Sequence, residues 1–455
     1  MSISTEKSII DSLEHLGHMI IDTIKRGKRE NIFPLYKTQY IKWKLDSFEY
    51  TEEGPKVRGA QGEHFLKTDW VMASYSVYKT IEKAKQYKEL INKLENNFTN
   101  FVESYLHDYV AKISRECFEE SLDESSLHKI AEIFLKDLQG EPLKLEIQSE
   151  LMGLILHPKS IRLPNNITLR QTQRNDLEKE ELESNFNRYG FFPTPSAFLK
   201  LETTTDNYSH YNQQIRKTLD ILRLFRVGYA TVIKTYGNSE SIIHHDLGTA
   251  ISHDREVPKE SVTIKVGEDE QLRDFYLQIQ EKIPNFFGIA NHHMEFSEIA
   301  YMRYVDALNK DHEIEPRIAN TMMGLESIYL KDAGELQELS YRLRLRIAKI
   351  MSFFGYDPHE VRTVVRDGYN IRSKFVHGSS LSFDSKTDLE EKHGKVQNIL
   401  SKLLDLLRIS IVISLMLYVN KDEFVESIDK SFLDKQSQNR IEQIINPGKH
   451  VLGLN

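Results

Sequence analysis

The spacing of apolar and polar residues predicts a helical beginning to the chain. Residues 79–97 are rich in Lys, Glu, Gln and Leu, and residues 97–117 place apolar side chains at helical intervals. Closer to the N-terminus, residues 52–61 contain and adjoin glycine and proline, which predicts a loop. We therefore expect residues 1–140 to form a helical N-terminal region that senses a trigger or binds a partner.

The pattern changes to strands and turns after residue 140. Apolar residues alternate with polar ones over residues 145–169, and proline and asparagine interrupt the alternation. The elements predicted next are an extended break, a helix and two strands, at residues 191–195, 215–229, 229–235 and 262–266. We expect residues 141–285 to be a mixed α+β domain with a small sheet.

From residue 286 the pattern is helical. Two helices are predicted over residues 319–330 and 335–354. Asp357 and Pro358 then mark the start of a third helix, because aspartate caps exposed amides and proline suits the first turn. Gly378 is a natural stop for that helix, since glycine readily adopts the left-handed conformation found at helix ends.

A capping-box pattern at residues 387–390 predicts a fourth helix that continues to Leu415. Together these signals predict a four-helix bundle within residues 286–455. The fourth helix is apolar on two faces, which suits either a complete core or a dimer seam. The fold class predicted for the chain is α+β, mainly α.

Composition narrows the class of protein. Hydrophobic residues make up 40% of the chain, as in folded proteins. The single cysteine, Cys117, excludes a disulfide within the chain and a cysteine-based zinc site, and it agrees with a reducing cytoplasm. Residues 1–26 lack the features of a signal peptide, and the longest apolar run, residues 409–419, is too short to span a bilayer at about 11 residues. We expect a cytoplasmic protein with no membrane association.

The net charge of −8 is unevenly distributed. A basic island lies within residues 342–374. Its basic members are Arg342, Arg344, Arg346, Lys349, Arg362, Arg366, Arg372 and Lys374, against Asp357, Glu360 and Asp367. A basic island on an acidic protein predicts a confined anionic ligand. The alternative is that some of these arginines pair with acidic residues elsewhere in the chain.

Residues 369–378 hold the most informative chemistry, because Arg372 precedes His377 by five residues. Arginine forks onto phosphate oxygens, and histidine gives or takes a proton near neutral pH, so the two could cut a phosphodiester bond without a metal. The spacing alone is a weak signal, because a histidine at a helix end can simply interact with the helix dipole.

Helical geometry sets a condition on this pair. Five residues turn an ideal helix by about 500°, which leaves the two side chains roughly 140° apart. Arg372 and His377 can converge only if the helix unwinds before Gly378, or if a second chain completes the site.

Three segments of the C-terminal region resemble the HEPN superfamily, and more closely its Apea-like branch. The segments are residues 324–327, 341–348 and 369–378. The resemblance extends over residues 315–420, and residues 151–224 are similar to the variable region often found ahead of such a domain.

The resemblance implies a fold, an assembly and an activity. HEPN domains are helical bundles that usually dimerise, and their Arg-x(4–6)-His motif lines a cleft between protomers. Many are metal-independent endoribonucleases of toxin–antitoxin, abortive-infection or CRISPR systems, and some are inactive binding modules. For this chain it implies RNA binding, a homodimer through the C-terminal bundle, no cofactor and no metal. It also implies a role in bacterial antiviral defence, with a partner protein from the same system.

The resemblance also assigns roles to residues. His377 would be the general acid and base, and Arg372 the clamp on the phosphate or the transition state. Two copies of each would converge across the dimer, which meets the geometric condition above. Ser373 is taken as a substrate-binding residue, although the family often has Asn, Asp or His directly after the arginine.

RNA cleavage needs little else, because RNA carries its own nucleophile in the 2′-hydroxyl. The enzyme must position the strand, move protons and stabilise the charged phosphorane. The expected products are a 2′,3′-cyclic phosphate, or its hydrolysis product, and a 5′-hydroxyl. Arg366 and Lys374 could bind backbone phosphates, and Tyr369 could stack on a base or pack in the core.

Two rival functions remain open. A non-catalytic HEPN-type protein that binds RNA, or that uses the bundle for dimerisation, would explain the net acidity equally well. The basic island could instead bind a nucleotide signal. RNA cleavage in EDTA that depends on His377 separates the enzyme from the non-catalytic protein.

Overall fold

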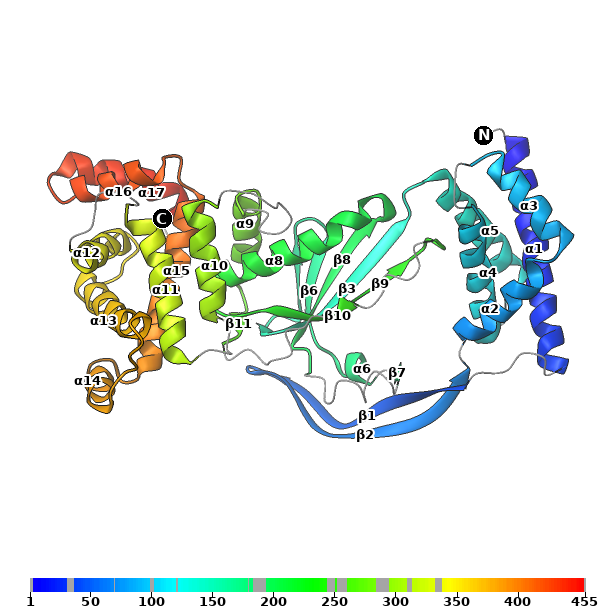
Figure 1. The fold of residues 1–455 in the computed structure, drawn as a ribbon, viewed down its shortest axis with the longest axis horizontal. Coiled ribbons are helices and arrows are strands. Elements are labelled where there is room, and N and C mark those ends of the chain that lie inside the picture. Colours follow the sequence, from blue (N-terminus) through cyan, green and yellow to red (C-terminus); the bar gives the residue numbers. More distant parts are fainter. Residues whose placement is uncertain are drawn as a thin grey trace. The chain divides into compact units, whose positions relative to one another are not determined.

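The computed structural model is mainly helical, with small sheets (Figure 1). The residues it describes are 3–30, 37–68, 70–98, 102–119, 122–178, 180–182, 194–243, 250–251, 260–283, 294–308, 313–331 and 338–453. The predicted class, α+β and mainly α, is confirmed.

The chain packs as two compact units, each built from separate stretches of sequence. The first unit comprises Met1–Glu150, Thr172–Asn212 and Lys234–Ser252, and the second comprises Leu151–Gln171, Gln213–Ile233 and His253–Asn455. The domain boundaries expected at residues 140 and 285 stay a prediction.

Five helices of the first unit share one apolar core. They are α1 (Ile3–Glu30), α2 (Trp70–Ile81), α3 (Lys85–Glu95), α4 (Val102–Glu119) and α5 (Glu124–Gln139). Helix α1 buries a stripe that includes Ile9, Leu13 and Ile20, as an amphipathic helix should. The Tyr109 hydroxyl on α4 donates to the Leu13 carbonyl oxygen at 2.9 Å. The helical segments expected after residue 79 are confirmed as α3 and α4.

A long hairpin interrupts this helical region and corrects the loop predicted at residues 52–61. Strands β1 (Lys37–Thr51) and β2 (Gly54–Thr68) pair antiparallel along their length, so that most of the expected loop is strand. The loop prediction rested on glycines, but Gly62 lies in the strand where a larger residue would not fit. A Cβ on Gly62 would lie 2.6 Å from Ile41 Cδ1, and Trp43 pairs with Gly62 across the ladder.

Further strands complete the first unit. They are β3 (Lys144–Met152), β7 (Glu180–Leu182), β8 (Ala197–Thr204), β9 (Thr231–Ser239) and β10 (Ala250–Ile251), with a short helix α6 (Arg174–Leu177) and the 3-10 helix η1 (Thr205–His210). One sheet has the order β2-β1-β7, and the other strands run in the order β10-β9-β3-β8. The boundary between the units falls within β3 and β9.

The second unit contains two strand pairs and most of the remaining helices. Strands β4 (Leu154–Leu156) and β11 (Val262–Ile264) pair parallel, and β5 (Ser160–Leu163) pairs antiparallel with β6 (Ile167–Gln171). The strands predicted at 145–169, 229–235 and 262–266 are therefore confirmed, and so is the helix predicted after residue 215, which is α8 (Tyr211–Phe225). Residues 191–193 of the expected break lie outside the described residues.

The second unit is helical from residue 294 onward, as predicted. Its helices are α9 (Asp269–Ile279), α10 (Phe296–Leu308), α11 (Ile314–Tyr329), α12 (Leu339–Ser352), α13 (Pro358–Val376), α14 (Phe383–His393), α15 (Val396–Leu415), α16 (Lys421–Lys430) and α17 (Lys435–Val451). Helices α11, α13 and α15 pack against one another, and α12 packs on α13. The predicted start of the second helix, near residue 335, lies outside the described residues.

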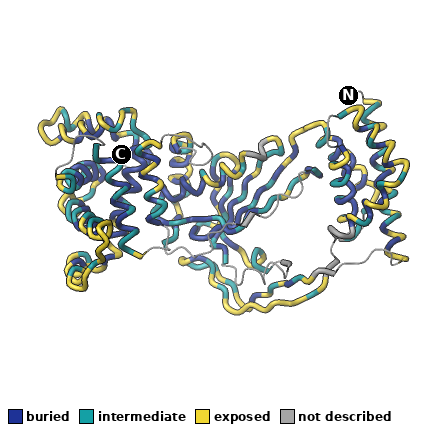
Figure 2. Tube along the Cα trace, viewed as in Figure 1, coloured by how far each residue is buried: buried dark blue, intermediate teal, exposed yellow. Residues whose placement is uncertain are grey.

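The fourth helix predicted in this region is wrong in its start. Ser382 caps α14 by accepting a hydrogen bond from the Ser385 amide, so the capping-box pattern at residues 387–390 lies inside a helix that has already begun. Gly394, at φ 81°, then ends α14, and α15 starts at Val396. From Leu403 onward helix α15 is buried on nearly all sides, which favours the complete core over the dimer seam, whereas α14 is largely exposed (Figure 2).

None of the helices that the structure describes is both long enough and apolar enough to cross a membrane.

Candidate functional site

Helix α13 carries every residue predicted for the site except His377, which caps its C-terminal end. At its start the Asp357 side chain accepts a hydrogen bond from the Glu360 amide at 2.8 Å, and Pro358 occupies the first turn, as predicted. At its end Gly378 has φ 78°, and the Gly378 amide donates to the Phe375 carbonyl oxygen at 3.0 Å. The helix is therefore closed by a regular glycine C-cap.

The regular end of α13 tests whether Arg372 and His377 meet through unwinding of the helix. Helix α13 stays regular to Val376, so it does not unwind before Gly378. On ideal helical geometry the two side chains remain roughly 140° apart. Of the two ways expected, unwinding of the helix end is not observed, and completion of the site by a second copy stays a prediction.

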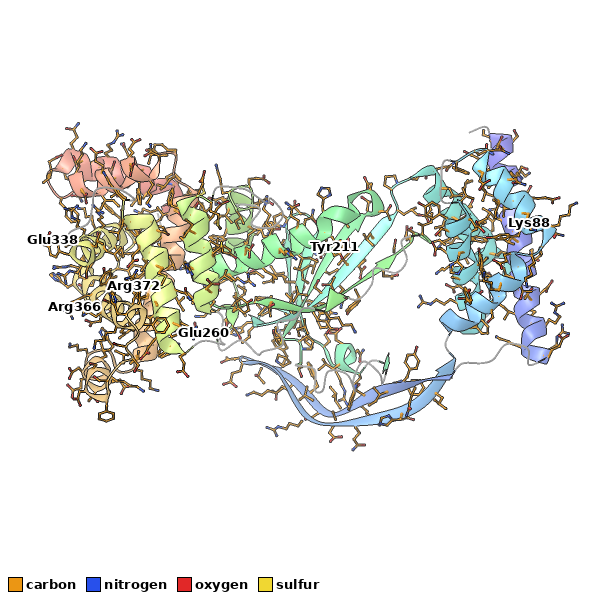
Figure 3. The ribbon with its side chains drawn as sticks, in the orientation of Figure 1. Lys88, Tyr211, Glu260, Glu338, Arg366 and Arg372 are labelled. Atoms are coloured by element: carbon orange, nitrogen blue, oxygen red, sulfur yellow. The ribbon has the colours of Figure 1, made fainter. Side chains whose placement is uncertain are left out.

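The Arg372 guanidinium contacts an acidic residue of helix α11. Its Nη2 donates to Glu326 Oε2 at 3.1 Å, and the two side chains are 24% and 18% exposed. Figure 3 labels Arg372 and Arg366 among the helices of the second unit. Arg372 Nε and Glu326 Oε1 are both buried and have no hydrogen-bond partner among the described residues. The contact is therefore a single hydrogen bond that leaves one buried polar atom on each side unsatisfied.

Burial sets the electrostatics of this contact. It raises the pKa of Glu326 above the usual value, while the positive charge of Arg372 acts in the opposite direction. The Arg372 guanidinium carbon also lies 5.9 Å from the centre of the Tyr369 ring, which is half-buried. Arg372 is thus held between an acidic and an aromatic side chain, with part of its surface accessible.

His377 has the opposite environment. Its side chain is exposed, and no residue of the described chain hydrogen-bonds to its ring. Three exposed apolar residues lie close to it in sequence, with exposed fractions of 39% for Phe375, 46% for Val376 and 83% for Phe383. His377 is thus accessible at the helix end, and exposed apolar residues lie near it in the sequence.

A second cluster lies earlier on α13 and was not predicted. The Asp367 carboxylate accepts from Arg366 Nε at 2.9 Å and contacts His393 Nε2 of helix α14 at 2.9 Å. Burial would raise the pKa of Asp367, but the hydrogen bonds from Arg366 and His393 outweigh it and hold that pKa below its usual range. Sequence spacing gave no signal for His393, because the contact joins two different helices.

The other predicted residues are distributed around the end of α13. Lys374 Nζ donates to Ser385 Oγ of α14 at 3.0 Å and is exposed. Ser373 is half-buried, and its carbonyl oxygen accepts from the His377 amide at 3.1 Å. Ser373 and Lys374 are thus on the same helix end as His377, but no contact between their side chains and its ring is seen in the described chain.

Several arginines of the basic island pair with acids, which confirms that alternative in part. Arg346 donates to both Asp429 carboxylate oxygens, at 2.8 and 2.7 Å, and is almost completely buried. Arg366 and Arg372 pair with Asp367 and Glu326 as described above. The island is therefore less positive than its sequence indicates.

The second unit also contains a cavity of about 650 Å³ that none of the predicted site residues lines. Its two arginines are already paired, Arg226 with Glu268 at 2.8 Å and Arg408 with Asp405 at 2.7 Å. Within the part of the chain that the structure describes, no three His, Cys, Asp or Glu side chains are grouped closely enough to hold a metal ion.

Comparisons with known proteins gave no match. No family model matches the chain, and no curated protein or solved structure matches it either. The HEPN resemblance therefore rests on the residues themselves.

Proposed function

We propose that this protein is a metal-independent endoribonuclease of the HEPN type, with a composite site formed by two copies of the chain. One observation carries the proposal. The Arg372 side chain is 24% exposed and makes one hydrogen bond to Glu326, and His377 is exposed at the end of the same helix. A partly exposed guanidinium and an exposed imidazole are the two groups that RNA cleavage needs.

The residues would act in defined steps. The His377 imidazole accepts the proton of the RNA 2′-hydroxyl as its oxygen attacks the adjacent phosphorus. Arg372 stabilises the charged phosphorane through the exposed part of its guanidinium, and Glu326 holds the guanidinium in place. The bond from phosphorus to the 5′-oxygen then breaks, and the protonated His377 imidazole gives its proton to the leaving oxygen. The products are a 2′,3′-cyclic phosphate and a 5′-hydroxyl.

A homodimer belongs to the same proposal. The two side chains point to different flanks of α13, so Arg372 of one copy would act with His377 of the other. The exposed Phe375, Val376 and Phe383 support a seam at this position. A cytoplasmic location, a role in bacterial antiphage defence or abortive infection, and a defence-system partner rest on the resemblance.

Incubation of the purified chain with total RNA in EDTA tests the proposal. We expect cleavage by the wild type and a loss of about 100-fold or more in His377→Ala and Arg372→Ala, the range for a missing acid–base group or charge stabiliser. His359→Ala is the matched control, because His359 is an exposed histidine of the same helix. Full cleavage by both site variants would contradict the proposal.

The non-catalytic alternative has one observation in its favour, because the pairing of Arg372 with Glu326 is also what a structural ion pair would give. In that case the protein would retain RNA without forming products. The same incubation distinguishes the two, since only the enzyme yields a 2′,3′-cyclic phosphate or its hydrolysis product.

A further inference from the structure

The Arg366, Asp367 and His393 cluster has a geometry suited to presenting a positive charge. Arg366 Nε and Nη2 contact the two Asp367 carboxylate oxygens at 2.9 and 3.3 Å. His393 Nε2 contacts the same carboxylate at 2.9 Å from the end of α14. The side chains of Asp367 and His393 are only 5% and 6% exposed, whereas that of Arg366 is 41% exposed. Two buried groups therefore hold one exposed guanidinium.

This arrangement leaves one edge of the guanidinium open. Adjacent residues of a helix point about 100° apart, so the Arg366 side chain must bend toward Asp367 to make these contacts. Its Nη1 donates to no residue that the structure describes. Asp367 thus fixes the Nε edge, and the Nη1 edge faces outward, where it can donate to an acceptor in solution.

The position of Arg366 on the helix connects it with the candidate site. Arg366, Ser373 and His377 lie within about 40° of one another around an ideal helix, so they share one side of α13. Along the axis, Arg366 and His377 are roughly 16 Å apart. A strand that passes His377 along this side would reach Arg366 several nucleotides from the bond that is cut.

We propose that Arg366 binds a backbone phosphate of single-stranded RNA at a distance from the cleaved bond, and that Asp367 and His393 are positioning residues for its guanidinium. The inference rests on the proposed function and names the form of its substrate. A single strand fits because the row of groups is one side chain wide, whereas a duplex presents two rows of phosphates.

The salt dependence of binding tests the role of Arg366. In full-length His377→Ala protein, which leaves the RNA uncut, the dissociation constant of a labelled single-stranded oligonucleotide is measured over a range of NaCl concentrations. We expect Arg366→Gln to weaken binding about tenfold and to reduce the slope of log K against log salt by about 0.7, which corresponds to one phosphate contact. Arg440→Gln is the control, because Arg440 is also an exposed arginine paired with an acid, Glu423.

Substitution at His393 tests the positioning role. We expect His393→Ala to weaken RNA binding several-fold and to raise KM without changing kcat in the cleaving enzyme. His393→Gln should restore binding, because its amide can still donate to Asp367. A loss of thermal stability with unchanged RNA affinity would show that His393 only stabilises the contact between α14 and α13, and would overturn the positioning role.

The outcomes separate this inference from the proposed function. An unchanged salt slope in Arg366→Gln, or tighter binding of duplex than of single-stranded RNA, would overturn the inference even if the wild type cleaves RNA. Conversely, absence of cleavage by the wild type would overturn the proposed function, while an Arg366-dependent slope would still support the phosphate contact.

Discussion

Arg372 illustrates how a residue can be bound and yet remain available for chemistry. It shares a single hydrogen bond with Glu326, and each partner keeps a buried polar atom without a hydrogen bond. Leaving such an atom unsatisfied costs about 1–3 kcal/mol. Glu326 therefore holds the guanidinium at a cost, and the 24% of the Arg372 side chain that is exposed remains available to a phosphate.

The shape of the guanidinium is therefore expected to matter as well as its charge. In Arg372→Lys the charge is kept, but lysine cannot contact Glu326 and a phosphate with two fixed donors. We predict that RNA cleavage falls at least about tenfold. Measurement of kcat and KM on one defined oligonucleotide checks this, with Arg440→Lys as the control. Wild-type activity in Arg372→Lys would show that a point charge suffices.

The lowered pKa of Asp367 predicts that the stability of the protein depends on pH. Its folded-state pKa is held below the usual value, so its contribution is present above the pKa of the unfolded chain and is lost as the pH falls through the folded-state pKa. At neutral pH we expect Asp367→Asn to lower the free energy of unfolding by roughly 2 kcal/mol. The difference from wild type should shrink below about pH 4.

Denaturant titrations at several pH values measure this difference. Asp384→Asn, at an exposed position in the first turn of α14, is the control. A difference between wild type and Asp367→Asn that stays constant down to pH 2 would contradict the ionised pairing of Asp367 with Arg366 and His393.

Local signals in the sequence predicted the ends of helix α13 correctly. Asp357 caps its start, and Gly378 terminates it, because both effects depend only on neighbouring backbone groups. The hairpin at β1 and β2 was missed, because glycine and proline are typical of loops and are uncommon in strands, whereas here they lie within the β1–β2 ladder. The Glu326 and His393 contacts could not be predicted from spacing, because they join helices that only the tertiary fold brings together.

Substitution of Gly378 tests whether this glycine ends helix α13. Gly378 has φ 78°, a conformation that costs a residue with a side chain about 1 kcal/mol or more. We predict that Gly378→Ala lowers stability by about that amount, and that Gly378→Asn lowers it less, because asparagine tolerates this conformation better. Thermal unfolding measures both, with Ser380→Ala as the control. Equal stability of all variants would contradict a helix closed at this residue.

On the scale of the whole molecule, all predicted site residues belong to the second unit, so the candidate chemistry does not depend on how the two units are arranged. In the proposed dimer each chain would supply half of each site, because the regular end of α13 leaves Arg372 and His377 roughly 140° apart on ideal helical geometry. A two-fold dimer would bring each arginine to the histidine of the partner and would create two equivalent arginine–histidine pairs in the shared site. Sensing by the N-terminal region stays a prediction.

Complementation between two inactive variants tests whether the site combines residues of two copies of the chain. Arg372→Ala and His377→Ala chains carrying different affinity tags are co-expressed, and the heterodimer is isolated with both tags and incubated with RNA. If each site combines residues of two copies, one site of the heterodimer is intact, so we predict about half of the wild-type rate, while both parent homodimers stay inactive. A heterodimer as inactive as its parents, beside an active wild type, would contradict the composite site.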